Sequence, residues 1–194
     1  TATTTDGTTT AAALNTLDVQ TDSATVDAGS VAIISGAVNE LNIAHESNDI
    51  SNLGDSDIEV AITSDTTVAA SQLNRLDENT LGTVDATSVQ SVYGAVNELN
   101  TAYAAGDITG LGNEDVTLTD GTLNDAEAGS DAAALNTLDG RTSGQINAES
   151  VDSISGSISD LGTAYTSSEI ANLGDSDETA TTTDGTTTAA ALNT

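Results

Sequence analysis

The chain lacks several residue types altogether and contains very few cations. Its 194 residues include no Pro, Cys, Met, Trp or Phe, and 2 Lys and Arg stand against 31 Asp and Glu, for a formal charge of -29. Without Cys there are no disulfides and no thiolate metal sites. The scarcity of cations argues against nucleic acid and anionic membrane surfaces as partners, because both are bound mainly through Lys and Arg.

Long apolar runs are missing as well. No stretch approaches the roughly 18 apolar residues of a transmembrane helix, so no membrane span is expected. There is also no initiator Met, signal-peptide pattern or lipidation motif, so the sequence is expected to be processed or an excerpt of a longer chain. High net charge with few aromatic residues is typical of disordered chains, but an internal repeat argues against disorder here.

The repeat is marked by the motif Leu-Asn-x-Leu-Asp. It occurs at residues 14–18, 73–77 and 135–139, and begins again at Leu192. Repeats of this length are typical of chains in which each unit buries its apolar face against its neighbours. We therefore divide the chain into three repeats of about 59 residues and two parts of flanking units: 14–72, 73–134 and 135–191, with 1–13 and 192–194 outside them.

A second period contains the first. Residues 1–16 recur letter for letter at 179–194, which indicates one super-repeat of a longer tandem array. A weaker half-period alternates steps of about 27 and 32 to 36 residues between Leu-Asn or Leu-Gly pairs, and indicates that each repeat is a duplicated unit of roughly 30 residues.

The first half of each repeat predicts a helix followed by a strand. Apolar residues at helical spacing predict a helix over 67–77, with Asp65 or Thr66 as its N-cap. A strand is expected over 81–84, ending in an Asp-x-x-Ser turn.

The second half has the clearest apolar pattern. Val89, Val92, Val96, Leu99 and Tyr103 are spaced 3, 4, 3 and 4 apart, and the other repeats keep the spacing, which predicts a helix with one apolar face. The glycine within this stripe disfavours a helix interior, so the alternative is a strand that ends at Gly and a helix that begins after it. Short strands are expected next, at 108–111 and 116–118 and, with strict alternation, at Ile58, Val60 and Ile62.

Helices and strands that each bury one face against a neighbour predict a stacked architecture. We expect an α/β repeat solenoid of about 59-residue units, in which short helices alternate with short parallel strands. An all-β solenoid is the alternative, and a string of small separate domains comes third, because no Pro-, Gly- or Ser-rich linker divides the repeats.

The sequence offers little for catalysis. His45 is the only histidine, and Tyr103 and Tyr165 take its place in the other repeats, which favours a half-buried structural role. Carboxylate pairs are the remaining catalytic option, but no repeat singles one out. The prediction is that the chain is not an enzyme and has no catalytic residues.

Calcium is the better chemical hypothesis, since Ca²⁺ takes six to eight oxygen ligands. The recurring Leu-Gly is followed by acidic turns, although these match no EF-hand or nonapeptide loop. The alternative is a set of solvated acidic turns, with divalent ions acting only by screening charge. The candidate metal ligands are Asp55, Asp57, Asn113, Asp115, Asp175 and Asp177.

Threonine is abundant, and it lines up between repeats when these are aligned on the Asp at positions 6, 65, 120 and 184. Such rows are a feature of ice-binding surfaces, but the strand propensity of Thr explains them equally well. These threonines are also candidates for O-glycans, whereas no Asn-x-Ser/Thr sequon is present. The rows are Thr5, Ser64, Thr119, Thr183 and Thr3, Ile62, Thr117, Thr181.

Four stretches carry a resemblance to known repeats. The motifs Leu-Asn-Thr-Leu-Asp-Gly (135–140), Gly-Thr-Val-Asp-Ala-Thr-Ser-Val (82–89), Asp-Ile-Thr-Gly-Leu-Gly-Asn-Glu (107–114) and Val-Thr-Leu-Thr-Asp (116–120) resemble tandem repeats of giant cell-surface proteins of marine cyanobacteria, of the swimming-motility type. The Ala-Val-Asn-Glu-Leu segments, at 37–41 and 95–99, also resemble repeats in tail fibres of marine phages.

Either resemblance implies an extracellular or cell-surface structural array. The predicted function is a non-catalytic repeat that forms a fibre, filament or surface coat by end-to-end stacking, with neighbouring repeats and other copies as partners, and with divalent cations and glycans as further candidates. The alternatives are a phage tail-fibre shaft, which implies a trimer, and a calcium-dependent adhesin or ice-binding repeat. Like charge over the whole surface keeps a very long chain soluble in salty medium.

Overall fold

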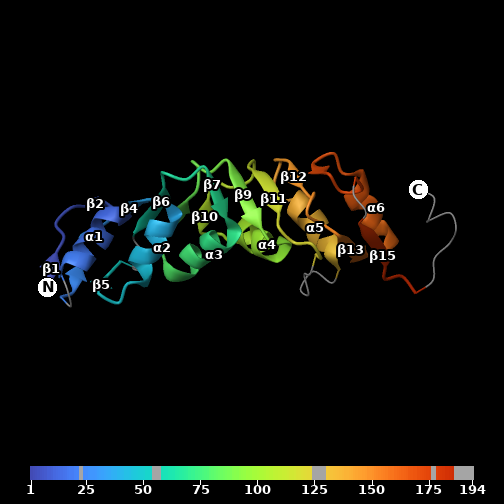
Figure 1. Cartoon of the computed structure of the whole chain (residues 1–194). Coiled ribbons are helices and arrows are strands. Elements are labelled where there is room, and N and C mark those ends of the chain that lie inside the picture. The colour runs from blue at the N-terminus through green and yellow to red at the C-terminus, as the bar shows by residue number, and fades with distance from the viewer. Residues whose placement is uncertain (22–23, 54–57, 124–129, 176–177, 186–194) are drawn as a thin grey trace. The chain divides into compact units, whose positions relative to one another are not determined.

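The computed structural model describes residues 1–21, 24–53, 58–123, 130–175 and 178–185. Asp55, Asp57 and Asp177, three of the candidate calcium ligands, lie outside these residues. The chain forms two compact units, shown in Figure 1. The N-terminal unit comprises Thr1–Gln90 and Ala105–Leu111, and the C-terminal unit comprises Ser91–Ala104 and Gly112–Thr194.

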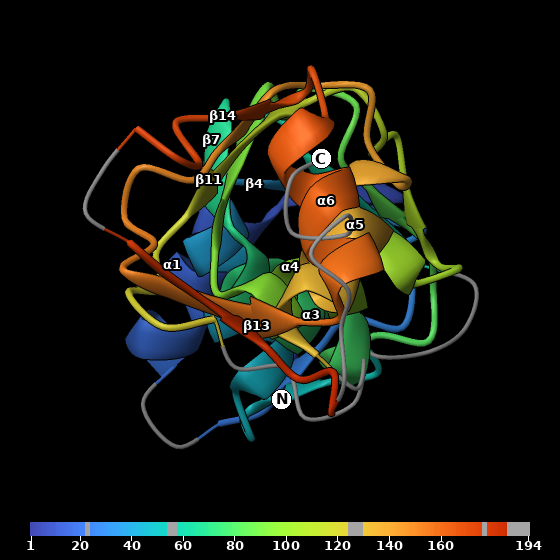
Figure 2. The same cartoon turned by 90° about the vertical axis from the view of Figure 1, so that its right-hand side faces the viewer.

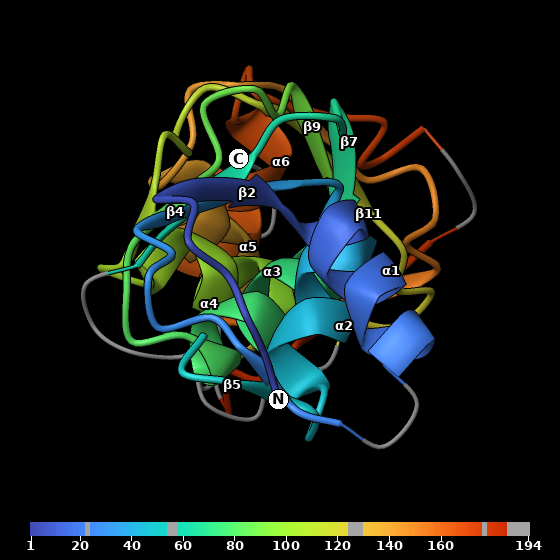
Figure 3. The same ribbon diagram turned by 90° about the vertical axis from the view of Figure 1, so that its left-hand side faces the viewer.

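In the N-terminal unit, short strands precede and follow each helix. The helices α1 and α2 lie side by side, as do α2 and α3 (Figures 1 and 3). The elements are β1 Ala2–Thr3, β2 Thr8–Thr10, α1 Ala11–Thr21, β3 Val26–Asp27, β4 Ile33–Gly36, α2 Val38–Glu46, β5 Ile50–Ser51, β6 Glu59–Ile62, β7 Thr67–Ala69, α3 Ala70–Asn79, β8 Val84–Asp85 and β10 Ile108–Thr109.

The C-terminal unit repeats the same order of elements. Its helices α4 and α5 pack together, and α5 packs against α6 (Figure 2). The elements are β9 Ser91–Gly94, α4 Val96–Ala104, β11 Asp115–Leu118, α5 Asp131–Asp139, β12 Ile146–Asn147, β13 Ser153–Gly156, α6 Ile158–Thr166, β14 Ile170–Ala171 and β15 Thr179–Thr182.

Every strand pair among the described residues of each unit is parallel. In the N-terminal unit the sheets run β1-β3-β5 and β10-β8-β6-β4-β2, and in the C-terminal unit β14-β12-β11-β9 and β13-β15. Residues 2, 26 and 50 are successive partners, so neighbouring strands there are 24 residues apart. In the C-terminal unit, Val116 pairs with Ile146, 30 residues further on. One turn of the chain therefore corresponds to the half-period of the sequence.

The alternation of short and long turns has a simple structural cause. Between β3 and β5 the chain forms one strand, β4, before its helix, whereas between β5 and β8 it forms two, β6 and β7, before α3. The extra strand accommodates the additional residues of the longer half. The α/β class predicted from the sequence is thereby confirmed, and the helices rule out the all-β alternative.

The core is built from aliphatic side chains of modest size. The first Leu of the Leu-Asn pairs is at most 2% exposed in five helices, while Val and Ile fill the strand positions between them. Burying one such side chain stabilises the fold by about 1.5 to 3 kcal/mol, which explains how a chain with three aromatic residues folds. These leucines are Leu14, Leu41, Leu73, Leu99 and Leu135.

The glycine in the second-half stripe ends a strand. Strand β9 ends at Gly94 and helix α4 begins at Val96, so Val92 belongs to the strand and Leu99 to the helix. The same division occurs at Gly36 and at Gly156. The alternative that placed a strand before the glycine is correct, and a continuous helix over the whole stripe is wrong.

Two strand and helix boundaries of the first half also differ from prediction. Residues 67–69 form β7, so α3 begins at Ala70, and its N-cap is Ala69 without a side-chain bond. Strand β8 begins only at Val84. Gly82 lies directly over the preceding turn, where an added Cβ would be 1.7 Å from the Ile58 carbonyl oxygen, and Gly144 lies similarly over Glu114. This close approach needs glycine and prevents a regular strand over 81–84.

Candidate functional site

The described calcium candidates do not form a metal site. The backbone N–H of Asn113 donates to the neighbouring Glu114 carboxylate, and the Asp115 carboxylate accepts from the Gln145 N–H at 3.3 Å. Asp175 is exposed. In the part of the chain that the structure describes, no group of three or more His, Cys, Asp or Glu side chains is placed to hold a metal ion. Calcium binding stays a prediction.

A buried carboxylate that the sequence did not single out lies beside these residues. Glu114 is 3% exposed. Its Oε2 accepts from the N–H of Gly112 at 2.6 Å, from the N–H of Asn113 at 3.1 Å and from the hydroxyl of Tyr103 at 3.3 Å. Burial, followed by the Glu114 charge, raises the pKa of the Tyr103 hydroxyl, so this group stays a hydrogen-bond donor at neutral pH.

The other repeats change both members of this pair together. Strand pairing places Ile58 and Glu178 at the position of Glu114, one residue before β6, β15 and β11 respectively. Glu178 accepts from the Tyr165 hydroxyl at 3.3 Å. Where the acid is replaced by Ile58, which is 4% exposed, the aromatic position holds His45. A tyrosine is thus found with a glutamate, and the histidine with an apolar residue.

The aspartates that follow the strands cap helices of the preceding turn. Asp65 accepts from the N–H of Val38 at 2.6 Å, although it was predicted to cap the helix that follows it. The equivalent bonds, from Val96 to Asp120 at 2.8 Å and from Ile158 to Asp184 at 2.9 Å, lie in the C-terminal unit. A carboxylate at a helix N-terminus satisfies a free N–H and interacts favourably with the helix dipole.

The Leu-Asn-x-Leu-Asp motif joins neighbouring helices. The amide of each Asn donates to a carbonyl oxygen in the first turns of the next helix: Asn15 to Glu40, Asn42 to Gln72, Asn100 to Ala134 and Asn136 to Asp160, at 3.0 to 3.1 Å. The terminal Asp accepts from the serine that caps the end of the next helix: Asp18 from Ser47 and Asp139 from Ser167. The leucines form the core and the polar residues link the turns.

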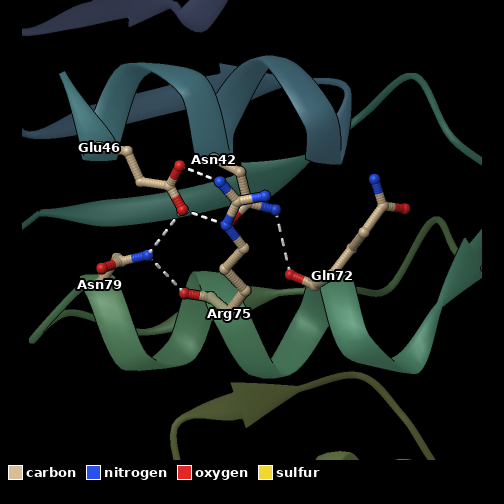
Figure 4. Close-up of polar contacts among 5 residues, drawn as sticks. All are labelled: Asn42, Glu46, Gln72, Arg75 and Asn79. Atoms are coloured by element: carbon tan, nitrogen blue, oxygen red, sulfur yellow. Dashed lines mark hydrogen bonds and ion pairs between the residues drawn. The ribbon is translucent and has the colours of Figure 1, made fainter.

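Both cations of the chain serve the same purpose. Arg75 on α3 pairs with Glu46 at the end of α2, close to the bond between Asn42 and Gln72 (Figure 4). The Asn79 amide also donates to Glu46, at 3.3 Å. In the C-terminal unit Arg141, which follows α5, donates to the Oδ1 of Asn100 on α4 at 3.0 Å.

The rows of threonines are not aligned as the sequence predicted. Pairing of Gly36 with Ile62, and of Gly94 with Leu118, places Ile62 at the position of Leu118 and not of Thr117. Both side chains are buried. The proposed row through Ile62 and Thr117 is therefore wrong, because one long turn has two residues between strand end and Asp where the other has one.

Comparisons of the chain with protein-family models, with curated proteins and with solved structures found no match. None of the helices among the described residues has the length and apolar character needed to cross a membrane. The polar geometry therefore stands without a relative. Its recurring bonds share one feature: each connects a turn of the chain to the turn before or after it.

Proposed function

We propose that the chain is a non-catalytic structural repeat of a very large extracellular or cell-surface protein. In this proposal its turns stack into an α/β solenoid, and the acidic repeats form a fibre, filament or surface coat by end-to-end stacking. The observation that carries the proposal is the recurring use of polar motif residues in bonds between successive turns. Three Asp caps and four Asn bonds repeat this arrangement in both units.

Bonds of this kind suit an array of any length. When each turn contacts only its neighbours, stability grows by similar increments as turns are added. Parallel strands 24 to 31 residues apart supply the backbone part of each increment, and the caps and Asn bonds supply the side-chain part. A motif copied along the chain then extends the structure without new chemistry.

The charge distribution agrees with a surface location. The net charge is -29, and the two arginines are engaged in bonds between turns. The remaining surface repels other copies of itself in dilute solution, and this repulsion is screened within about 8 Å at physiological salt. A long acidic array therefore stays soluble and packs more closely in salty medium.

The test uses arrays that repeat residues 1–178 two, three and four times. Small-angle X-ray scattering is expected to give a maximum dimension that rises linearly with the number of blocks, as for a continuous rod. A matched array with Asp65, Asp120 and Asp184 changed to Ala lacks the caps and is expected to unfold at lower temperature. Growth with about the 0.6 power of length, as in a flexible chain, would overturn the proposal.

Two further measurements decide between this function and its alternatives. Sedimentation of the 194-residue chain is expected to give no trimer, whereas a phage fibre shaft requires one. Addition of a chelator is expected to leave the melting temperature unchanged if the acidic turns are merely solvated. A loss of many degrees would instead identify specific calcium sites and favour a calcium-dependent adhesin.

A further inference from the structure

The segment Thr-Ala-Thr-Thr-Thr-Asp-Gly occurs twice and is seen in two different environments. At residues 1–7 it forms β1, which pairs with β3, and at 179–185 it forms β15, which pairs with β13 (Figures 1 and 3). Among the described residues β1 has no partner other than β3, and β15 none other than β13. Each copy therefore leaves one strand edge unpaired.

The two environments use opposite edges of the same strand. At β1 the N–H groups of Ala2 and Thr4 donate to β3, at 2.8 and 2.9 Å. At β15 the N–H groups of Thr179 and Thr183, the equivalents of Thr1 and Thr5, donate to Asp152 and Gly156. Because successive N–H groups of a strand point to opposite sides, the two sets of bonds do not compete. One copy of the segment is able to make both.

The helix cap belongs to the same arrangement. Asp184 accepts from the N–H of Ile158, the first residue of α6, at 2.9 Å. Asp6 is its equivalent in the first copy, and it is exposed. An identical segment seated on β13 would therefore bring its own cap for α6.

We propose that a second copy of this chain docks head to tail at β13, with its residues 1–7 taking the place that residues 179–185 hold. The register is then Thr1 opposite Ser153 and Thr3 opposite Ser155, as Thr179 and Thr181 are now. The incoming strand keeps its pairing with its own β3, so the parallel ladder continues from one molecule into the next. This inference deepens the proposed function and rests on it.

The exchange replaces one segment by another of identical sequence, so the local bonds are conserved. What opposes it is the cost of joining two molecules. Exchange of an identical element between copies is a known route to assembly, and an unpaired parallel edge is a template for it. Removing the internal cap with Asp184→Ala weakens the resident segment, while Asp6 of the second copy restores the cap.

The experiment uses the absence of native cysteine. The full chain carries Asp184→Ala together with Thr3→Cys and Ser155→Cys, whose positions would be ladder partners at a separation that a disulfide spans. Mild oxidation is expected to produce covalent dimers and longer head-to-tail chains on a non-reducing gel. Adding Asp6→Ala is expected to lower the cross-linked fraction about fivefold, because the cap is then lost from both segments.

Two controls make the result decisive. In the wild-type background, Ser155→Cys with Thr181→Cys is expected to close within one molecule, which shows that the place on β13 is intact. Thr4→Cys replaces Thr3→Cys as a register control, since a slip of one residue turns the side chain to the other face. The proposal is overturned if the Thr3 pair gives no intermolecular product, or if Thr4 cross-links equally well. The scattering of covalent arrays is unaffected by either outcome, so the proposed function is judged separately.

Discussion

The N-terminal and C-terminal units build the same helix pair with different supporting contacts. In the N-terminal unit, α2 ends beside His45 and an apolar Ile58, and Arg75 binds Glu46 at the surface. In the C-terminal unit, Tyr103 binds the buried Glu114, and Arg141 binds the Asn100 amide. The difference teaches that strand pairing, caps and Asn bonds form the constant frame, while neighbouring side chains vary together within it.

The strongest way to break this comparison is to remove the buried acid of the C-terminal unit. Glu114→Ala leaves two backbone N–H groups and the Tyr103 hydroxyl without their acceptor, and is expected to cost about 3 kcal/mol. Urea unfolding measures the loss. Glu178→Ala is the matched control and is expected to cost about 1 kcal/mol, because Glu178 accepts from the exposed Tyr165 only among the described residues. Equal losses would contradict this account.

Exchanging the pair as a whole sharpens the same comparison. Glu114→Ile combined with Tyr103→His introduces the residues of the N-terminal unit, and the double variant is expected to lose less than the sum of the two single variants. Neighbouring residues typically couple by about 0.5 to 3 kcal/mol in such cycles. Additive losses in urea unfolding would show that the two residues vary independently.

The asparagines of the two units are expected to differ next in magnitude. Both oxygen and nitrogen of the Asn100 amide are bonded, whereas Oδ1 of Asn42 has no partner among the described residues. Asn100→Ala is therefore expected to cost about 2 kcal/mol and Asn42→Ala about 1 kcal/mol in chemical unfolding. In an Arg141→Met background the two losses are expected to become equal, and a persistent gap would assign the difference to another contact.

The caps are expected to behave alike in both units. Asp65→Ala and Asp120→Ala each remove an acceptor from the N-terminus of the preceding helix, and each is expected to cost about 1 kcal/mol. Replacement by Asn keeps an acceptor oxygen and is expected to restore much of the loss in thermal unfolding. A large loss at one position only would show that the caps are not a shared device.

The histidine adds a pH dependence that its tyrosine equivalents lack. Burial lowers the pKa of His45 below its ordinary value of 6.5, with the Asn79 backbone opposing part of the shift. The unfolded chain then binds a proton more readily than the folded one, so this contribution to stability falls as the pH drops below 6.5. His45→Tyr is expected to reduce the loss of melting temperature between pH 7 and 5. An unchanged loss would contradict the sign.

The surface ion pair is expected to have the smallest effect. Arg75 is exposed, so Arg75→Met is expected to change the unfolding free energy little and less at high salt. Unfolding curves at low and high salt measure the change. Arg141→Met serves as the comparison, because its partner Asn100 is 8% exposed and its effect is expected to persist in salt.

Periodicity was sufficient to locate most elements. The positions of α4 and β11 and the half-period of the turn follow from apolar spacing, which records what each residue type needs from its surroundings. It misplaced the start of α3, because residues 67–69 satisfy a strand pattern and a helix pattern equally well. Pairing in the folded chain settled that choice.

The candidate site was harder to predict for a related reason. Glu114 was overlooked beside the acidic turns, although the joint change of Tyr103 to His45 and of Glu114 to Ile58 was a signal in the sequence. Asp65 was recognised as a cap, but its helix is the preceding one, 27 residues away at Val38. Sequence distance gives no measure of such contacts until the strand register is known.

Composition and repetition alone establish an acidic chain of copied units with a thin aliphatic core. Residue types and their spacing record local preference and burial, and these are properties of each repeat alone. The tertiary structure decided which strand edges meet, and hence that Asp caps and Asn amides bind across turns. Hydrogen bonds are directional and reach only about 3 Å, so their partners follow from register and not from periodicity.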